Sequence, residues 1–281
     1  MLFGNCISHK DISRVKILKE LGFDYVETLL APMYAASKAE IDDFSDALEE
    51  NAIKCKAVNV LFPGDIRLTG ESADFERAGD YIKEIFEKTK RLKFDIVVFG
   101  SGGARKVPEG FDKATATGQL IELINSHLLP AAEKHDFTLV IEELNKAETN
   151  ILNYIGECEK LVKQVKHPRV KLLADLYHIG LEADDVGALS CYGETLAHCH
   201  IANPYNSRFY PKASDGLEAV SLYNGFFDSL RAAGYAGGIS IEGALGGLGE
   251  FCDADVPEWV GEDDRRFFAE SQNSLGFLRK L

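Results

Sequence analysis

The chain has 281 residues, of which 46% are hydrophobic, and 31 lysines and arginines stand against 45 aspartates and glutamates. The formal charge of -14 repels phosphate backbones and therefore disfavours a nucleic-acid partner. No apolar run approaches the roughly 18 residues needed to span a bilayer, so we expect no membrane partner.

The cysteines and the first residues indicate a compartment. Six cysteines show no Cys-x-x-Cys pair and no spacing typical of a disulfide framework. The beginning of the sequence lacks a basic region followed by a long apolar stretch, which a secretion signal would need. We therefore expect reduced, buried thiols in a cytoplasmic protein that acts on small metabolites. Assembly into a homo-oligomer is left open.

Strand-like and helix-like segments alternate along the chain. Eight short runs, several of them almost entirely apolar, are typical of strands covered on both faces. In chain order these runs are Leu2–Cys6, Phe23–Thr28, Cys55–Leu61, Asp95–Phe99, Phe137–Glu142, Val170–Asp175, Leu196–Ile201 and Gly238–Glu242.

Amphipathic helical patterns fill the intervals between these runs. The first helix has Asp11 as its expected cap and Gly22 as its end, and the next pattern follows Ser37. Between the sixth and seventh strands the expected helix is short, around Asp185–Cys191. Eight strands with about eight crossovers predict a (β/α)8 TIM barrel that forms one domain over residues 1–281. An open doubly wound sheet is the alternative, but the first strand–helix turn lacks a Gly-x-Gly-x-x-Gly motif.

Polar residues stand at the ends of four late strand-like runs, namely Glu142, Asp175, His200 and Glu242. A barrel of parallel strands brings such ends to one face, where barrel enzymes keep their active sites. Three carboxylates and one imidazole suit a divalent ion such as Mn²⁺, Mg²⁺, Co²⁺ or Zn²⁺. We therefore predict a metal-dependent active site.

The residues alone leave three points open. Asp175 can be a helix cap instead of a ligand. His198 and His200 point to the same side of a strand, and His198 is expected one layer deeper as a structural histidine. Glu142 and Glu143 are adjacent, so only one of them faces inward, and the spacing does not decide which.

Several motifs carry a family resemblance. The stretch from Glu142 through Asn145 and Lys146 to Glu148 fits a Glu-x-x-Asn-Arg-x-Glu pattern, with lysine in place of arginine. The Asp-x-x-His and His-x-His motifs follow, as do an arginine, Arg208, and a glutamate at the eighth strand. In these features the chain resembles the sugar isomerase/epimerase superfamily of xylose isomerase-like TIM barrels, which includes tagatose and psicose 3-epimerases and hydroxypyruvate isomerase. It departs from the pattern at Ser207, which separates Asn206 from Arg208, and after Gly243.

The resemblance implies a metal-dependent isomerase or epimerase acting on a sugar or sugar phosphate. It selects Glu142 over Glu143 as a ligand of one divalent ion, and it makes Glu142 and Glu242 the catalytic pair. These glutamates would move protons through a metal-stabilised enediolate. Glu148, His178 and Arg208 would bind the substrate.

Other activities fit the same site less well. An inosose dehydratase-like lyase would use the same residues. An endonuclease IV-like phosphodiesterase would need three zinc ions and more histidines than the seven present. A barrel that binds sugar without catalysis would have no use for four ligands. A phosphate on the substrate could be held by Arg105 and the glycine-rich loops 100–103 and 246–249, although these glycines could also serve only as tight turns.

Overall fold

The computed structural model describes residues 1–246 and 256–281. Eight parallel strands pair in sequence order, and β8 closes onto β1, so that the sheet forms a barrel. Each strand lies within two residues of its predicted run at either end, and the predicted (β/α)8 TIM barrel is confirmed. The strands are β1 (Leu2–Ile7), β2 (Tyr25–Leu29), β3 (Lys54–Asn59), β4 (Ile96–Phe99), β5 (Thr138–Glu142), β6 (Val170–Asp175), β7 (Leu196–Ile201) and β8 (Gly238–Ile241).

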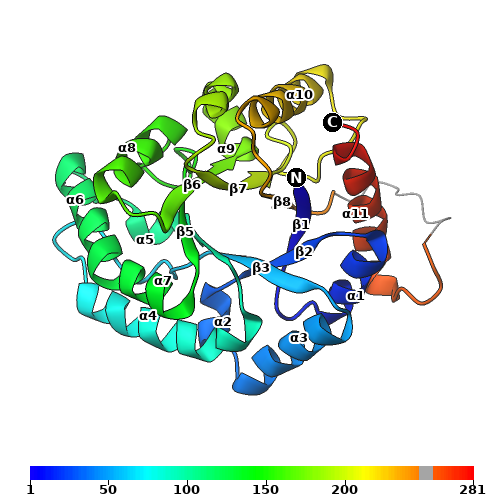
Figure 1. The fold of residues 1–281 in the computed structure, drawn as a ribbon, viewed down its shortest axis with the longest axis horizontal. Coiled ribbons are helices and arrows are strands. Elements are labelled where there is room, and N and C mark those ends of the chain that lie inside the picture. The colour runs from blue at the N-terminus through cyan, green and yellow to red at the C-terminus, as the bar shows by residue number, and fades with distance from the viewer. Residues whose placement is uncertain (247–255) are drawn as a thin grey trace.

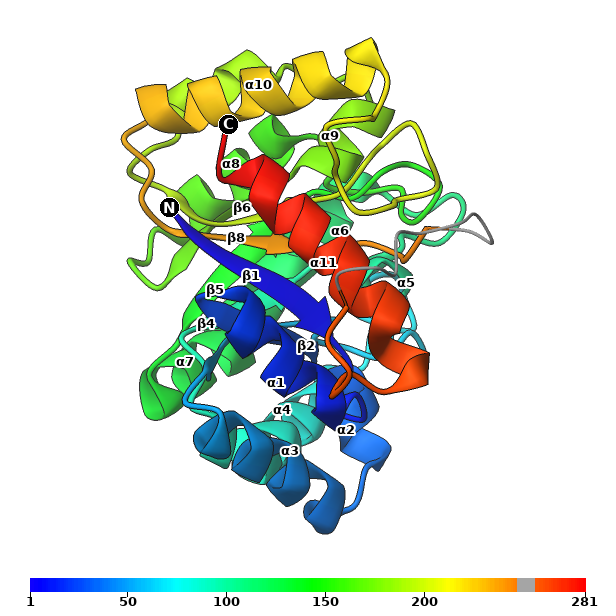
Figure 2. The same ribbon diagram turned by 90° about the vertical axis from the view of Figure 1, so that its right-hand side faces the viewer.

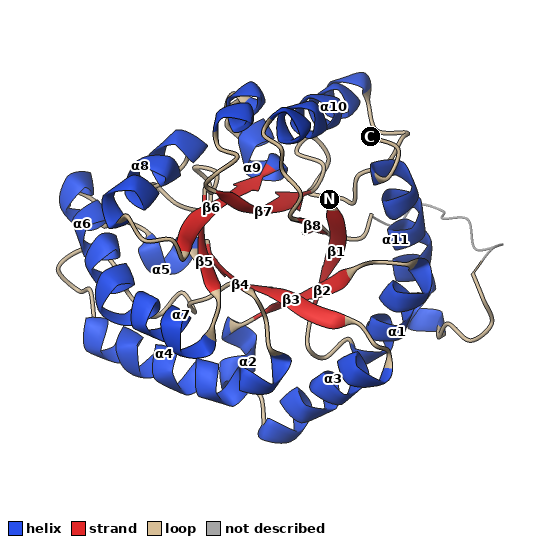
Figure 3. Ribbon diagram, in the orientation of Figure 1, coloured by secondary structure: helices blue, strands red, loops and turns tan. Residues whose placement is uncertain are grey.

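Helices surround this ring of strands (Figures 1 and 3). The α-helices are α1 (Ile12–Leu21), α2 (Ala31–Ala35), α3 (Lys38–Glu50), α4 (Phe75–Thr89), α5 (Gly102–Arg105), α6 (Lys113–Leu123), α7 (Leu129–His135), α8 (Ile155–Val165), α9 (Leu176–Leu181), α10 (Leu217–Ala232) and α11 (Arg265–Leu278). Short 3-10 turns are η1 (Lys90–Leu92), η3 (Val186–Cys191) and η4 (Glu262–Asp264), and a π turn, η2 (Ile124–Leu128), joins α6 to α7.

Local sequence explains where several helices begin and end. Gly22 adopts the left-handed conformation (φ 84°) that ends α1, as predicted. Ser37 and Glu40 form a reciprocal capping box at α3, in which each side chain accepts the other residue's backbone N–H. Asp11 lies at the N-cap position of α1, as predicted, but its carboxylate makes no cap hydrogen bond to the helix and instead accepts the backbone N–H of Ser8.

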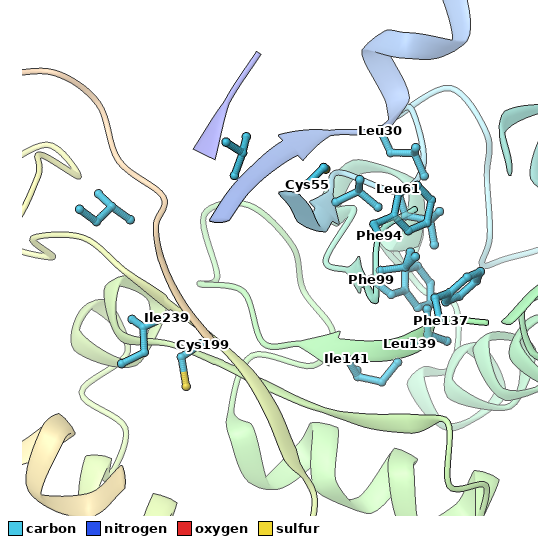
Figure 4. Close-up of a cluster of buried hydrophobic side chains, with 14 of the residues drawn as sticks. Leu30, Cys55, Leu61, Phe94, Phe99, Phe137, Leu139, Ile141, Cys199 and Ile239 are labelled. Atoms are coloured by element: carbon cyan, nitrogen blue, oxygen red, sulfur yellow. The ribbon is translucent and has the colours of Figure 1, made fainter. Parts of the chain in front are cut away.

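The main core lies between the outside of the barrel and the helices. Figure 4 shows Phe94, Phe99 and Phe137 packed with aliphatic side chains in this layer, and Phe137 also contacts Phe86 of α4 at 4.8 Å between ring centroids. A second, smaller apolar cluster fills the inside of the barrel with Ala57, Ile96, Val98, Val140 and Leu173. Alternate strand residues face opposite sides, and both sides are covered, by the helices outside and by this cluster inside. The strands are therefore apolar almost throughout.

In Figure 2 the arrow of β1 points toward the end of the barrel where the strands finish, and α11 packs beside α1. We call this end the mouth. None of the described helices is long and apolar enough to cross a membrane. The five cysteines among the described residues are unpaired. The expectation that they are buried holds for Cys55, Cys158 and Cys199, whereas Cys6 is half-buried and Cys191 is exposed. Cys252 lies outside the described residues.

Candidate active site

The predicted site residues meet at the mouth because strand alternation points them inward. Val140 and Leu173 lie inside the barrel, and the residues two positions later, Glu142 and Asp175, face the same way at the strand ends. His200 is the last residue but one of β7, and Glu242 directly follows β8.

The four predicted ligands form one cluster. Nδ1 of His200 lies 3.0 Å from Oε1 of Glu142 and 3.2 Å from Oε2 of Glu242. One ligand atom from each of these residues and from Asp175 lies within 4.8 Å of all the others. Glu142, Asp175 and His200 are buried, and Glu242 is partly exposed. The structure therefore brings these four residues together, and their role as metal ligands stays a prediction.

Asp175 fills both roles that the sequence left open. Its Oδ1 accepts the backbone N–H of Tyr177 at 2.8 Å and caps α9. Its Oδ2 faces the cluster, 3.3 Å from Nη2 of Arg208 and 3.4 Å from Nε2 of His178. The carboxylate is therefore anchored by one oxygen and offers the other to the site.

The structure also decides which glutamate of the adjacent pair 142/143 and which histidine of the pair 198/200 reaches the cluster. Glu143 points away from the mouth and accepts the backbone N–H of Asp175 at 2.7 Å, and burial raises the pKa of Glu143 well above its usual value. His198 is fully buried, and its Nε2 lies 2.7 Å from Oε2 of Glu27. Glu142 and His200 are thus the members of each pair that reach the cluster.

The pKa values of the three clustered carboxylates are shifted in different directions. Burial raises the pKa of Asp175 to about 6, although Arg208 and His200 favour its ionised form. Burial also raises the pKa of Glu142, against hydrogen bonding from His200. For Glu242 burial is outweighed by Arg208 and His200, which together lower its pKa to about 2. Three carboxylates that share a buried space require cations, and Arg208 alone does not balance them.

The predicted substrate-binding residues border the cluster. Nη1 of Arg208 lies 3.7 Å from Oε1 of Glu148, and its guanidinium stacks over the ring of Tyr177 at 4.7 Å. Nη2 of Arg208 also makes a short contact with Oε2 of Glu242. Arg208 therefore touches two of the predicted ligands directly.

His178 is held in one orientation by its neighbour. The backbone N–H of Asn145 donates to Nδ1 of His178 at 3.2 Å, and burial lowers the pKa of the imidazole. With Nδ1 accepting, a neutral ring carries its proton on Nε2, which has no hydrogen-bond partner among the described residues. His178 therefore presents an N–H donor next to Asp175.

Sequence reasoning missed residues that support the cluster. Nδ2 of Asn59 donates to Oε1 of Glu242 at 2.8 Å, and Glu27 contacts His200 from below. Both residues could have been found from the sequence as polar residues within otherwise apolar strands. Burying such a residue costs free energy unless it is hydrogen-bonded. A Cβ at Gly100 would lie 2.0 Å from Oε2 of Glu142, so this glycine leaves room for the carboxylate.

The expectation that Arg105 holds a phosphate is wrong. Its side chain is fully buried and donates to the carbonyl oxygens of Phe99 at 3.0 Å and Leu152 at 3.4 Å, so it ties β4 to a neighbouring loop. Most of the glycine-rich loop 246–249 lies outside the described residues.

The donor set fits a hard divalent cation. Such ions prefer carboxylate oxygens with one or two imidazoles, and three carboxylates plus one histidine provide this. Because Nδ1 of His200 faces two carboxylates, a proton or a metal ion must lie between them to avoid repulsion. Carboxylates on both sides of the ring, Glu27 at Nε2 and Glu242 and Glu142 at Nδ1, raise the pKa of His200 well above its usual value despite burial, and they favour positive charge at this point.

Sugar epimerases are among the known proteins to which this chain is similar over most of its length. A D-psicose 3-epimerase of Agrobacterium fabrum is 27% identical over 277 residues, covering 94% of this chain and 91% of that protein. An L-ribulose 3-epimerase of Mesorhizobium japonicum is 24% identical over 234 residues, covering 80% and 72%. A solved D-psicose 3-epimerase with D-tagatose from Clostridium cellulolyticum has the same fold, with a TM-score of 0.79, 20% identity and coverage of 100% and 99%.

The sequence profile of one family covers most of the chain. It is described as the xylose isomerase-like TIM barrel, and it matches residues 15–260. With the closed barrel and the cluster at its mouth, this match confirms the resemblance seen in the motifs. The chain belongs to the xylose isomerase-like TIM barrel family.

Proposed function

We propose that this protein is a ketose 3-epimerase that depends on one divalent cation. The observation that carries the proposal is the convergence of Glu142 and Glu242 on Nδ1 of His200, at 3.0 and 3.2 Å, from strands on different sides of the mouth. The named relatives, which epimerise carbon 3 of ketoses, agree with the isomerase class predicted from the sequence.

Glu142, Asp175, His200 and Glu242 would hold the cation. When bound, it would polarise the carbonyl and neighbouring hydroxyl oxygens of a ketose and so acidify the hydrogen on carbon 3. Glu142 and Glu242 would exchange the proton, one removing it and the other returning one from the opposite face. Each glutamate keeps a second carboxylate oxygen for this purpose, beside Gly100 for Glu142 and hydrogen-bonded by Asn59 for Glu242.

Three further groups would orient the sugar. Nε2–H of His178 and the guanidinium of Arg208 would donate to hydroxyl or carbonyl oxygens, and Glu148 would accept from a hydroxyl. Glu148 is itself held by Nδ2 of Asn145 at 3.0 Å. These donors and acceptors border the carboxylate cluster and so hold the sugar next to the proton-transfer groups.

The proposal is tested by incubating the Mn²⁺-loaded protein with D-psicose, D-fructose, D-tagatose or an inosose in D₂O and following the products by NMR. We expect the epimer at carbon 3, with solvent deuterium at that carbon. An aldose product would instead identify an aldose–ketose isomerase, and loss of water from an inosose would identify a dehydratase. Either result would contradict the proposed reaction.

Glu242→Gln tests the proton transfer separately from metal binding. The amide oxygen can still ligate, but the basic group is gone, so turnover should fall by about 10²-fold or more. Metal content, measured by mass spectrometry, should be at least partly retained. Near-wild-type turnover in the metal-loaded variant would show that Glu242 does not transfer a proton.

A further inference from the structure

Beneath the four predicted ligands lies a buried polar network around Glu27 of β2. Nε2 of His200 donates to Oε1 of Glu27 at 2.8 Å, and Nε2 of His198 donates to Oε2 at 2.7 Å. The hydroxyl of Ser240 donates to the same Oε2 at 2.5 Å and lies 2.9 Å from the hydroxyl of Tyr25. All five side chains are buried. The network ties β2 to β7 and β8 through the inside of the barrel.

The two ring nitrogens of His200 face different partners. Nε2 faces Glu27, whereas Nδ1 faces Glu142 and Glu242 at the mouth. A carboxylate offers only acceptors, so Glu27 holds a proton on Nε2, and a cation that took the place of the proton between Nδ1 and the two mouth carboxylates would leave a neutral ring with that single proton. The lone pair then lies on Nδ1, the nitrogen that points into the ligand cluster.

We propose that Glu27 is a positioning residue for the cation site, which fixes the ring orientation and tautomer of His200 so that Nδ1 is free to ligate. Hydrogen bonds from a carboxylate to the outer nitrogen of a metal-binding histidine commonly have this effect, and their loss weakens metal binding. The inference rests on the proposed function, because it takes His200 as a ligand. It adds a residue that does not touch the cation or the sugar.

The packing around the network holds Glu27 in place. A Cβ at Gly4 would lie 2.1 Å from the ring of Tyr25, and a Cβ at Gly238 would lie 2.6 Å from its hydroxyl. The two glycines therefore leave the space that Tyr25 fills, and Tyr25 in turn contacts Ser240 beside Glu27. A carboxylate surrounded in this way cannot turn from His200 without a shift of the strands.

Glu27 also belongs to a second group of side chains whose spacing would suit a cation. Cys6, Glu27 and His200 each place one ligand atom within 4.8 Å of the others, which is close enough for a second cation. However, the two oxygens of Glu27 already accept three hydrogen bonds from buried donors. A second ion on Glu27 would have to compete with these buried donors, so the positioning role is favoured, and stoichiometry distinguishes the two.

The first experiment measures Mn²⁺ binding to the EDTA-stripped protein by titration calorimetry. Glu27→Gln should bind Mn²⁺ about 10- to 100-fold more weakly, because its amide can donate as well as accept and no longer enforces one tautomer of His200. Tyr25→Phe is the matched control: it removes a buried hydroxyl from the same network without touching Glu27, and its Mn²⁺ affinity should stay near that of the wild type.

The second experiment reads the tautomer directly, by long-range ¹H–¹⁵N NMR of ¹⁵N-histidine-labelled, Zn²⁺-loaded protein, with His200 assigned through a His200→Gln variant. We expect a protonated Nε2 and a metal-bound Nδ1. Because this measurement uses the wild-type protein, it decides the proposal even if Glu27→Gln does not fold. A protonated Nδ1 in the loaded protein would overturn it.

The outcomes separate this proposal from the proposed function. Wild-type Mn²⁺ affinity in folded Glu27→Gln, or two ions per wild-type chain with one lost in that variant, would overturn the positioning role and leave the epimerase proposal standing. Failure of the wild-type protein to bind any Mn²⁺ would overturn the metal-dependent function first, and the role of Glu27 with it.

Discussion

Gly100 follows β4 at a point where any side chain would collide with Glu142. The Cβ of an alanine there would lie 2.0 Å from Oε2 of Glu142, a separation that two nonbonded atoms do not reach. The neighbouring Gly103 is different, because its nearest contact for a Cβ is the Cα of Gly64 at 3.5 Å, an ordinary packing distance. The two glycines, one directly after β4 and one in α5, thus differ in whether a side chain would fit.

We predict that Gly100→Ala displaces the carboxylate of Glu142 and lowers kcat/KM by about 10²-fold, the usual cost of moving a catalytic group by about 1 Å. Bound Mn²⁺, measured by mass spectrometry, should fall as well. Gly103→Ala is the matched control and should keep both activity and metal. If Gly100→Ala retains wild-type metal content and turnover, Glu142 is neither ligand nor base in the way proposed.

Among the elements, the loop after β7 brings Arg208 back over the mouth. Ser207 and Arg208 have φ values of 50° and 58°, a left-handed conformation that costs non-glycine residues free energy. The loop is nevertheless held firmly, since the N–H of Ala244 donates to the carbonyl of Arg208 at 2.9 Å and Phe209 pairs with Ala244. A tight turn thus accommodates the additional residue, Ser207, and keeps Arg208 at the site.

Arg208→Ala should raise KM and lower turnover, with a loss in kcat/KM of about 10²-fold, because the sugar loses a fixed donor. Metal content should not fall, since removing a cation beside Glu242 and Asp175 does not weaken their attraction for Mn²⁺. Arg169→Ala is a suitable control, because Arg169, directly before β6, pairs with Asp136, shortly before β5, at the end of the barrel opposite the mouth. Reduced metal content with unchanged KM would instead assign Arg208 to holding the ligands.

Local irregularities in the strands also direct side chains into the site. The pairing of β2 with β3 shifts by one residue between Val26 and Glu27, and that of β6 with β7 shifts between Leu172 and Leu173, opposite Ala197. Such bulges turn a strand and re-aim its side chains, and they are common next to active sites. Here they lie beside the residues that form the Glu27 network.

At the scale of the whole molecule, the proposed cation should stabilise the barrel because its predicted ligands lie at or next to the ends of four strands. Mn²⁺ at about 100 times its Kd adds about 2.7 kcal/mol, which should raise Tm by about 5–10 °C in a protein of this size. Differential scanning calorimetry with Mn²⁺ and with EDTA measures this difference.

This stabilisation should depend on pH in a definite direction. The pKa of Asp175 is raised to about 6 and that of Glu142 is raised too, so protons compete with Mn²⁺ for these oxygens as the pH falls. The increase in Tm should be complete above about pH 7 and decline below about pH 6. An increase that persists at pH 5, or none at any pH, would contradict a site built on these ligands.

Much of this architecture could be predicted from the sequence. Apolar runs at regular intervals, separated by amphipathic patterns, were enough for eight strands and the barrel, because strand and helix periods are local properties. The four predicted ligands followed from a rule of topology, since parallel strands end on one face. The motif containing Glu142, Asn145 and Glu148 then selected Glu142 over its neighbour.

What only the tertiary structure decided concerns contacts between strands far apart in sequence. Glu27 and His200 are 173 positions apart and meet only because the barrel closes and the bulges set their directions. Closure of the barrel also brings Asn59 into contact with Glu242 and places Gly100 where only a glycine leaves room for the carboxylate of Glu142. Arg105 shows the converse: its place in a glycine-rich stretch indicated a phosphate, whereas packing buries it beneath the loop. Periodicity determines which face a residue takes, but only closure and register determine what that residue touches.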